Sequence, residues 1–222
     1  MLYLVPTPIG NLADMTYRAV DQLKQADLIA CEDTRTSGVL LNHYGIDTPT
    51  TSFHAHNEHD KTPHLVQRMR VGHDVALITD AGSPGISDPG FYLARACHEA
   101  GVPVSALPGA TAFVPALTAS GLPSDRFVFE GFLPRKKGRS SRLETLSTEP
   151  RTLVFYESPY RLVRTLSDLE QAFASSRDAA VARELTKVHE EMRRGSLEEL
   201  RKYYASQSKV RGECVIVVAG YE

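Results

Sequence analysis

Four glycine- and proline-rich segments of this 222-residue chain carry polar side chains where strands are predicted to end. The longest reads LITDAGSPGISDPG (residues 77–90), in which an apolar strand gives way at Asp80 to a loop of small residues. The others are PTPIGNLAD (6–14), CEDTRTS (31–37) and PGATA (108–112). Glycine lets a backbone approach a ligand closely, and proline stiffens a loop in advance. Because ligands of open α/β sheets bind outside the carboxyl ends of the strands, we expect these loops to form a binding site.

The side chains of these loops indicate the kind of ligand. Asp80 can accept hydrogen bonds from hydroxyls or amines, while Ser83, Thr111 and free backbone N–H groups can donate to a carboxylate. The loops have neither the G-x-G-x-x-G spacing of a dinucleotide site nor the lysine of a P-loop. Any one of them alone is typical of a simple turn. Several such loops at one sheet edge instead indicate a ligand site. Because the phosphate-binding motifs are missing, a zwitterionic or ribose-bearing ligand is favoured over a polyphosphate.

The stretch PRKKGRSSR (134–142) is the one strongly basic segment. Its cations are Arg135, Lys136, Lys137, Arg139 and Arg142, with no aromatic residue among them. The whole chain has 25 basic and 27 acidic residues and a formal net charge of −2, so contact with nucleic acid would depend on a local patch. Such a segment suits sequence-independent phosphate contacts, although in isolation it is more often a solvated loop.

The histidine-rich segment FHAHNEHDKTPH (53–64) does not predict a metal site. It crosses a predicted strand end and helix start, which scatters the side chains of His54, His56, His59 and His64, and it contains no cysteine. We expect no metal, and we expect Asn57 and its neighbours to line the substrate side of the site. The three cysteines are far apart and odd in number, so we expect neither a disulfide framework nor a zinc site. A Ser-His-Asp hydrolase is disfavoured because no G-x-S-x-G elbow is present.

The first half of the chain alternates between predicted strands and helices, which indicates a parallel sheet of right-handed βαβ units. The predicted strands are 2–7, 27–33, 50–55, 74–80 and 102–109, and the predicted helices are 14–26, 34–45, 57–72 and 89–101.

The second half alternates less regularly, which favours a mixed sheet. A short helix in segment 110–126 leads into it; strands are predicted at 127–133, 152–158 and 212–220, and helices at 160–173 and 187–207. The fold class is therefore α/β, with an N-terminal domain at 1–118 and a C-terminal domain at 119–222. We expect the ligand to bind in a cleft between the two domains.

Seven segments occur in the order TPIGNLAD, CEDTR, ITDAGSPGISDPG, PGATA, FEGFLPRK, FYESPYR and ARELTKVHEE. Together they resemble the bacterial 16S ribosomal RNA cytidine 2′-O-methyltransferases of the tetrapyrrole-methylase superfamily. The resemblance runs from Leu4 to about Gly220. It implies a tetrapyrrole-methylase-like fold, S-adenosylmethionine as cofactor, 16S ribosomal RNA within the small ribosomal subunit as substrate, and a homodimer.

The resemblance also implies which residues bind the cofactor. S-adenosylmethionine carries a sulfonium, an amino-acid group, a ribose and an adenine, and it has no phosphate, in agreement with the polar loops described above. The implied cofactor-binding residues are Asp80, Ser83, Ile86, Thr111, Ala112, Tyr156 and Leu185.

Transfer of a methyl group to a ribose hydroxyl needs alignment of the reactants and a base or polarising group. The candidates are Glu32, Asp33 and Arg35 of CEDTR, facing Glu184 and Lys187 of RELTK. Lys187 could act as the base, while Arg35 and Arg183 could hold phosphates. The same side chains could instead form structural ion pairs, and the sequence leaves open which group takes the proton.

Four other functions remain as alternatives. A tetrapyrrole C-methyltransferase or a protein-histidine methylase would not need the basic segment, and a non-enzymatic RNA-binding module would not need the ligand loops. A nicotinamide-dependent oxidoreductase is disfavoured because G-x-G-x-x-G is missing.

The first ten residues are too short to span a membrane and lack a basic leader, so we expect a cytoplasmic protein. Members of the group often continue past the last strand into a small extension, whereas this sequence ends at Glu222. We expect such a difference to affect affinity for the ribosomal subunit rather than the chemistry.

Overall fold

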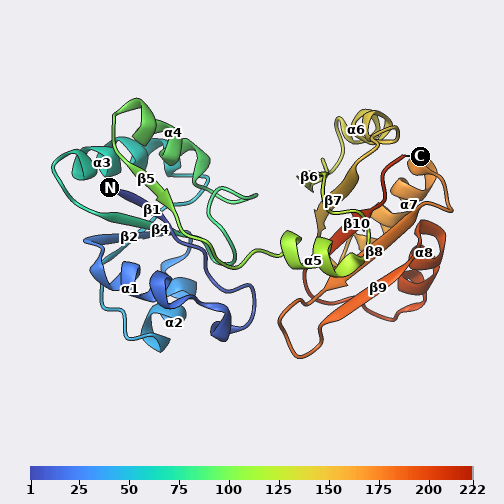
Figure 1. The fold of residues 1–222 in the computed structure, drawn as a ribbon, viewed down its shortest axis with the longest axis horizontal. Coiled ribbons are helices and arrows are strands. Elements are labelled where there is room, and N and C mark those ends of the chain that lie inside the picture. The colour runs from blue at the N-terminus through green and yellow to red at the C-terminus, as the bar shows by residue number, and fades with distance from the viewer. Residues whose placement is uncertain (222) are drawn as a thin grey trace. The chain divides into compact units, whose positions relative to one another are not determined.

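The computed structural model describes residues 1–221 and divides the chain into two compact units, Met1–Thr111 and the segment from Ala112 onward (Figure 1). The boundary therefore lies earlier than the expected 118/119 position. The reason is helix α5 (Phe113–Ser120), whose Ala116 and Leu117 pack against strands of the second unit.

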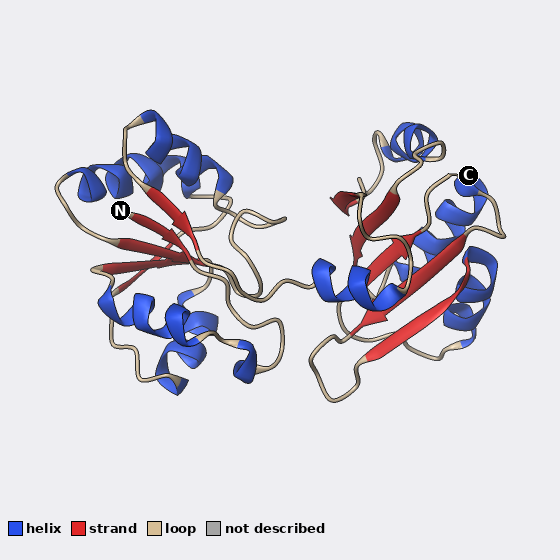
Figure 2. Cartoon of the chain, in the orientation of Figure 1, coloured by secondary structure: helices blue, strands red, loops and turns tan. Residues whose placement is uncertain are grey.

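The N-terminal unit is a five-stranded parallel sheet with helices on both faces (Figure 2). Its elements are β1 (Leu2–Leu4), the 3-10 turn η1 (Leu12–Asp14), α1 (Tyr17–Gln25), β2 (Leu28–Cys31), α2 (Thr34–His43), β3 (Thr50–Ser52), α3 (Glu58–Arg70), β4 (Val75–Ile78), α4 (Phe91–Glu99) and β5 (Val104–Ala106). The strand order is β3-β2-β4-β1-β5, and every pair is parallel, which confirms the prediction for this half.

The central strands of this sheet are buried on both faces, because successive side chains alternate between two cores. In β2, Ile29 and Cys31 pack with α1 and α2, whereas Leu28 and Ala30 pack with α3 and α4. The sequence also determines where helices begin: the Thr16 hydroxyl accepts the Ala19 N–H and caps α1.

The C-terminal unit is a mixed sheet, as predicted, and its five strands have the order β6-β7-β10-β8-β9. Besides α5 it contains β6 (Phe127–Phe132), α6 (Arg139–Leu146), β7 (Thr152–Glu157), α7 (Leu162–Phe173), β8 (Asp178–Arg183), β9 (Glu191–Ser196), α8 (Leu197–Ser206) and β10 (Cys214–Val218). Among the described strands of this unit, β6 and β7 pair in parallel and the other neighbours pair antiparallel. Helices α6, α7 and α8 share one core, and α5 packs on the opposite face.

One predicted element of this unit is wrong. The segment 187–207 was expected to be helical throughout, but Glu191–Ser196 forms strand β9, which pairs with all of β8. Tertiary pairing overrides the local helical pattern here. The helix starts only at Leu197, after Ser196 and Glu199 form a reciprocal capping box.

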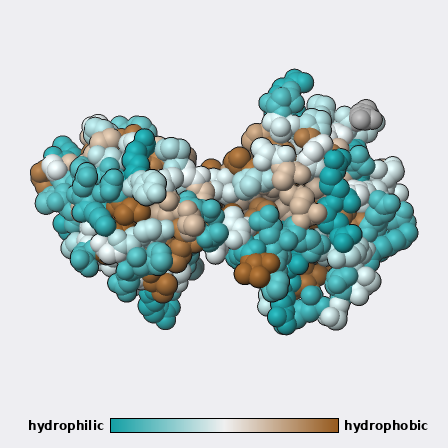
Figure 3. All heavy atoms as spheres, turned by 60° about the horizontal axis from the view of Figure 1, so that its bottom comes forward, coloured by the Kyte–Doolittle hydropathy of each residue, from teal (hydrophilic) through white to brown (hydrophobic). Residues whose placement is uncertain are grey.

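Hydrophilic side chains cover most of the face shown in Figure 3, and the apolar patches on it are small and separate. No helix among the described residues is long and apolar enough to cross a membrane.

Candidate functional site

Three of the predicted ligand loops in the N-terminal unit are joined by hydrogen bonds. Thr7, after β1, and Gly82, after β4, exchange two backbone hydrogen bonds of 2.9 Å. The Ser83 hydroxyl donates to the carbonyl of Ala110, after β5, at 3.2 Å. The Thr7 hydroxyl donates to the Thr79 carbonyl at 3.0 Å. The carboxyl ends of β1, β4 and β5 therefore form one connected polar edge, as strand-end loops of a parallel sheet can.

Glycine is required at two positions of this edge. A Cβ on Gly90 would lie 2.9 Å from the Gly85 nitrogen, and Gly90 has a φ of +147°. A Cβ on Gly109 would lie 2.7 Å from the Pro6 side chain. A larger residue at Gly109 would push the loops after β5 and β1 apart, and one at Gly90 would distort the loop after β4 itself, so both conformations depend on the missing side chain.

The predicted cofactor-binding residues of this unit lie on these loops. Asp80 is exposed, and its Oδ1 accepts the Asp33 N–H at 3.3 Å. Ser83 and Ile86 close a turn through an Ile86 N–H bond to the Ser83 carbonyl. Thr111 and Ala112 lie where the first unit ends and the second begins, and both are half-buried.

Three carboxylates, Glu32, Asp33 and Asp80, follow strands β2 and β4, but they differ in electrostatic character. Hydrogen bonds from the Arg35 side chain and backbone lower the pKa of Asp33 to about 2. Burial, followed by the charge of Asp80, raises the pKa of Glu32. Partial desolvation raises the pKa of Asp80 and outweighs the hydrogen bond from the Asp33 N–H, which lowers it; the Asp33 charge adds to the rise. Asp33 also caps α2, so it serves as a charged structural group.

Arg35, proposed as a phosphate ligand, is held by Asp33 through two side-chain hydrogen bonds of 2.8 and 3.2 Å. Its side chain is nevertheless 90% exposed. It can contact a partner while it remains paired with Asp33.

Asn57 orders the histidine-rich loop after β3. Its Oδ1 accepts the His54 N–H at 2.9 Å, and its Nδ2 lies 3.2 Å from both the Ser52 hydroxyl and His54 Nε2. The Asn57 carbonyl oxygen thus accepts a hydrogen bond, and its amide nitrogen donates one to His54 Nε2. Because Nε2 is then the acceptor, the ring proton of His54 is on Nδ1. That nitrogen is buried and has no partner.

In the C-terminal unit, Tyr156 and Leu185 belong to one apolar face. Both are half-buried against the core that contains α5, together with Phe129 and Met192. The Tyr156 ring meets Phe129 edge-on at 5.0 Å and Phe132 at 5.6 Å. This aromatic face can accept a flat apolar ring.

The RELTK loop has a strained backbone. Glu184 and Thr186 adopt positive φ values of 51° and 67°, which side chains of this kind rarely adopt. The Lys187 ammonium pairs with Glu184 Oε1 at 2.9 Å, and the Glu190 carboxylate accepts the Thr186 N–H at 2.6 Å. Strain of this kind tends to occur at functional loops. The two expected catalytic residues of this unit are thus paired with each other.

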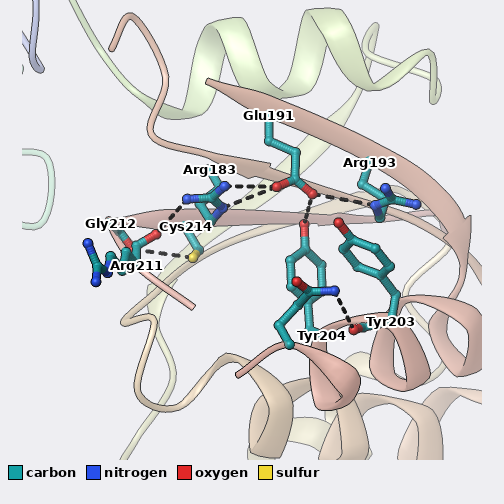
Figure 4. A network of polar contacts seen from close by, with 9 residues as sticks. Arg183, Glu191, Arg193, Tyr203, Tyr204, Arg211, Gly212 and Cys214 are labelled. Atoms are coloured by element: carbon teal, nitrogen blue, oxygen red, sulfur yellow. Dashed lines mark hydrogen bonds and ion pairs between the residues drawn. The ribbon is translucent and has the colours of Figure 1, made fainter. Parts of the chain in front are cut away.

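Of the two roles that the sequence leaves open for Arg183, phosphate contact and a structural ion pair, the structure shows the ion pair. Its guanidinium donates to Glu191 at 2.9 and 3.3 Å and to the Arg211 carbonyl at 3.0 Å (Figure 4). Burial opposes charge on Glu191, but hydrogen bonds from Arg183 and Tyr204 outweigh it and lower the Glu191 pKa. The network anchors β8 and β9 beside the RELTK loop.

The basic segment divides into two kinds of residue. Arg135, Lys136 and Lys137 are exposed on the loop after β6. Arg139 is only 7% exposed, lies on α6 and pairs with Asp168 at 2.7 Å. Arg142, also on α6, donates to Glu130 at 2.8 Å. The prediction that all five bind RNA is corrected for Arg139, because its buried guanidinium is already bound by Asp168. Arg142 is paired with Glu130 but exposed, as Arg35 is, so its contact with RNA stays a prediction.

Comparison with known proteins identifies the family. The family model described as Tetrapyrrole (Corrin/Porphyrin) Methylases matches residues 1–201. The chain belongs to the tetrapyrrole methylase family. Among its relatives, a protein of Synechocystis sp. named "Ribosomal RNA small subunit methyltransferase I" is 51% identical over 221 residues, 99% of this chain and 79% of that protein. A protein of the same name from Pseudomonas aeruginosa is 50% identical over 223 residues, 100% of this chain and 79% of that protein.

Solved structures share the fold at low identity. Diphthine synthase matches with a TM-score of 0.74 and 15% identity, covering 98% of this chain and 89% of that one. The Thermus thermophilus uroporphyrin-III C-methyl transferase complexed with S-adenyl homocysteine matches with a TM-score of 0.66 and 21% identity, covering 98% and 96%. These likenesses establish the tetrapyrrole methylase fold.

Sequence reasoning missed the polar side chains that lie inside the C-terminal unit. Glu157 is 1% exposed and Thr165 is fully buried, and the two share a 2.6 Å hydrogen bond. A carboxylate at the end of the apolar run TLVFYE was the available signal, because a buried charge must have a partner.

Proposed function

We propose that the protein is an S-adenosylmethionine-dependent methyltransferase that methylates the ribose 2′-hydroxyl of a cytidine in 16S ribosomal RNA, in the cytoplasm and as a homodimer. The observation that carries this proposal is the roughly 50% identity to proteins named ribosomal RNA small subunit methyltransferase I along nearly the whole chain. The tetrapyrrole-methylating neighbours are far more distant, at 16–22% identity. The alternative of a tetrapyrrole C-methyltransferase is therefore not favoured.

The residues present fit the cofactor. The connected edge of the N-terminal unit offers backbone groups held close by Gly90 and Gly109, with the exposed Asp80 carboxylate beside them. Carboxylates commonly accept hydrogen bonds from ribose hydroxyls or ammonium groups. We assign cofactor binding to Asp80, Ser83, Ile86 and Thr111 in this unit and to Ala112, Tyr156 and Leu185 in the other.

When bound, S-adenosylmethionine supplies a methyl group on a positively charged sulfur, which is already activated for displacement. The protein's own residues must then bind the reactants, align them and handle one proton. Asp33 remains ionised because of its low pKa, so it does not take up a proton near neutral pH. Glu32, with its raised pKa, is better suited to hold the proton that the hydroxyl loses.

The paired Glu184 and Lys187 belong to the same proposal. Their ion pair of 2.9 Å lies on a strained loop, and we assign it the role of polarising the substrate hydroxyl. Arg35, exposed although paired, and the exposed cations Arg135, Lys136 and Lys137 contact RNA phosphates.

The proposal is tested by incubating the protein with methyl-labelled S-adenosylmethionine and either small ribosomal subunits or naked 16S ribosomal RNA. We expect label in the RNA fraction of at least one of the two substrates. Label in ribosomal protein only, or in neither fraction although calorimetry shows the cofactor to be bound, contradicts the assigned substrate. Failure to bind the cofactor contradicts the enzymatic proposal and favours a non-enzymatic RNA-binding module.

A further inference from the structure

The basic loop of the C-terminal unit is closed by one buried arginine. Arg139 follows directly after the loop formed by residues 134–138, and its guanidinium reaches back to the Pro134 carbonyl at 3.2 Å. The Arg139 N–H also bonds to the Lys136 carbonyl at 3.2 Å. Side chain and backbone of a single residue thus hold both the start and the middle of the loop.

The same guanidinium fixes the loop to helix α7. Its Nε donates to Asp168 Oδ2 at 2.7 Å, and its Nη2 donates to the Thr165 hydroxyl at 2.8 Å. Both partners come from α7, one turn apart. Charge-assisted hydrogen bonds of this length are strong and directional, so the guanidinium has one preferred orientation.

The Thr165 hydroxyl continues the network. Because it accepts from Arg139, its own proton is free to be donated to Glu157 Oε2, at 2.6 Å. The other oxygen of Glu157 accepts the Ser158 N–H at 2.7 Å and pairs with Arg161 at 2.6 Å. Two cations and two carboxylates therefore balance one another, and Thr165 is the neutral link between them.

We propose that Arg139 is the positioning residue of the RNA-binding loop: it holds residues 134–138 in one conformation and so presents Arg135, Lys136 and Lys137 to RNA phosphates. This inference rests on the proposed function. A loop that is already ordered loses less conformational entropy on binding than a mobile one. The hydrogen bonds of Arg139 therefore increase RNA affinity although Arg139 does not contact RNA. The three exposed cations make the contacts, and the buried arginine determines where they lie.

The experiment uses the full chain and compares Thr165→Val with Thr165→Ser. Valine has nearly the same volume but neither accepts from Arg139 nor donates to Glu157, whereas serine keeps the hydroxyl. Without RNA, trypsin should cleave after residues 135–137 faster in Thr165→Val than in wild type, and Thr165→Ser should match wild type. Asp168→Asn provides a second variant that removes the charge partner of Arg139 and keeps the threonine.

RNA binding is then measured with naked 16S ribosomal RNA at several salt concentrations, at a temperature where circular dichroism shows every variant folded. Lys136→Gln/Lys137→Gln should weaken binding and reduce the salt slope by about 1.4–1.8, since two phosphate contacts are lost. Thr165→Val should weaken binding about tenfold. When Thr165→Val is added to Lys136→Gln/Lys137→Gln, RNA binding should weaken little further, because the loop then carries only one of its three cations.

The outcomes separate the two claims. If the double glutamine variant binds RNA like wild type at all salt concentrations, the proposed RNA-binding loop is wrong. If that variant is weakened but Thr165→Val and Asp168→Asn bind as wild type does, Arg139 is not a positioning residue. Effects of Thr165→Val that add in full to those of the double variant would show a general loss of stability, which also contradicts the inference.

Discussion

Neighbouring acidic side chains of the CEDTR motif have opposite roles in this structure. Asp33 caps α2, accepts hydrogen bonds from Arg35 and has a pKa of about 2. Glu32, one position earlier, is partly buried near Asp80, and its pKa is raised. The sequence named both as candidates, because residue type and position do not reveal which of two adjacent carboxylates is desolvated. The difference depends on neighbours from another strand.

Glu32→Gln should stabilise the protein near neutral pH. The raised pKa means that the folded state holds the Glu32 proton more tightly than the unfolded state does. As pH rises above about 4.5, the unfolded chain loses this proton first, so the wild type loses stability. Glutamine carries no charge and avoids this loss. Thermal unfolding should therefore give a higher Tm for the variant at pH 7.5 and a similar Tm at pH 4.

Glu99→Gln is the matched control for that measurement, because Glu99 lies exposed on α4 and pairs with Arg95. It should give no rise in Tm at pH 7.5. A lower Tm for Glu32→Gln than for wild type at pH 7.5 would show that the Glu32 charge stabilises the fold, contrary to the account.

Lys187→Ala should lower the rate of methyl transfer by about 10²- to 10⁴-fold, since it removes the cation of the pair assigned to polarise the hydroxyl. Cofactor affinity, measured by calorimetry, should remain close to wild type. Lys202→Ala is the control: Lys202 also pairs with a glutamate, Glu198, but on the exposed face of α8. Equal rates for the two variants would remove Lys187 from the proposed reaction residues.

At the scale of elements, alternation of apolar runs and caps was enough to predict the parallel sheet and its helices. It failed at residues 187–207, where the charged segment EMRRGS forms strand β9 at the sheet edge. Charged residues are depleted in strands, so propensity favoured a helix, and only the pairing with β8 determines the outcome. It also failed to show that α6 starts at Arg139, which removes two cations from the basic loop.

The loop after β4 depends on glycine, and Gly90→Ala tests that dependence. The added Cβ would meet the Gly85 nitrogen at 2.9 Å while the backbone has a φ of +147°. We expect a loss of more than about 1 kcal/mol in unfolding free energy and weaker binding of S-adenosylmethionine. Chemical denaturation and calorimetry measure the two effects.

Gly38→Ala is the control for that experiment. Gly38 lies inside α2, and a Cβ there meets nothing within 4 Å. This change should raise stability by about 0.5–1 kcal/mol and leave cofactor binding unchanged. If Gly90→Ala behaves in the same way as this control, the β4 loop does not require its glycine.

At the scale of the whole molecule, the sequence predicted two α/β units and placed the ligand loops at strand ends, and both features are present. The boundary between units differed, because α5 follows the loop PGATA without a break and only the packing of α5 on the second sheet assigns this helix to the C-terminal unit. The buried hydrogen bonds of Thr165 could not be predicted from the sequence. Its partner Glu157 lies 8 residues away in the chain, and its partner Arg139 lies 26 residues away.

The chemistry of the methylated product tests the proposed function most directly, because it shows which atom of the RNA receives the methyl group. Small ribosomal subunits are methylated with labelled S-adenosylmethionine, and the extracted RNA is hydrolysed in alkali. A methyl group on a ribose 2′-oxygen blocks cleavage of the adjacent phosphodiester, so we predict label in an alkali-resistant dinucleotide. Label released as a single nucleotide would place the methyl group on a base and contradict the central claim.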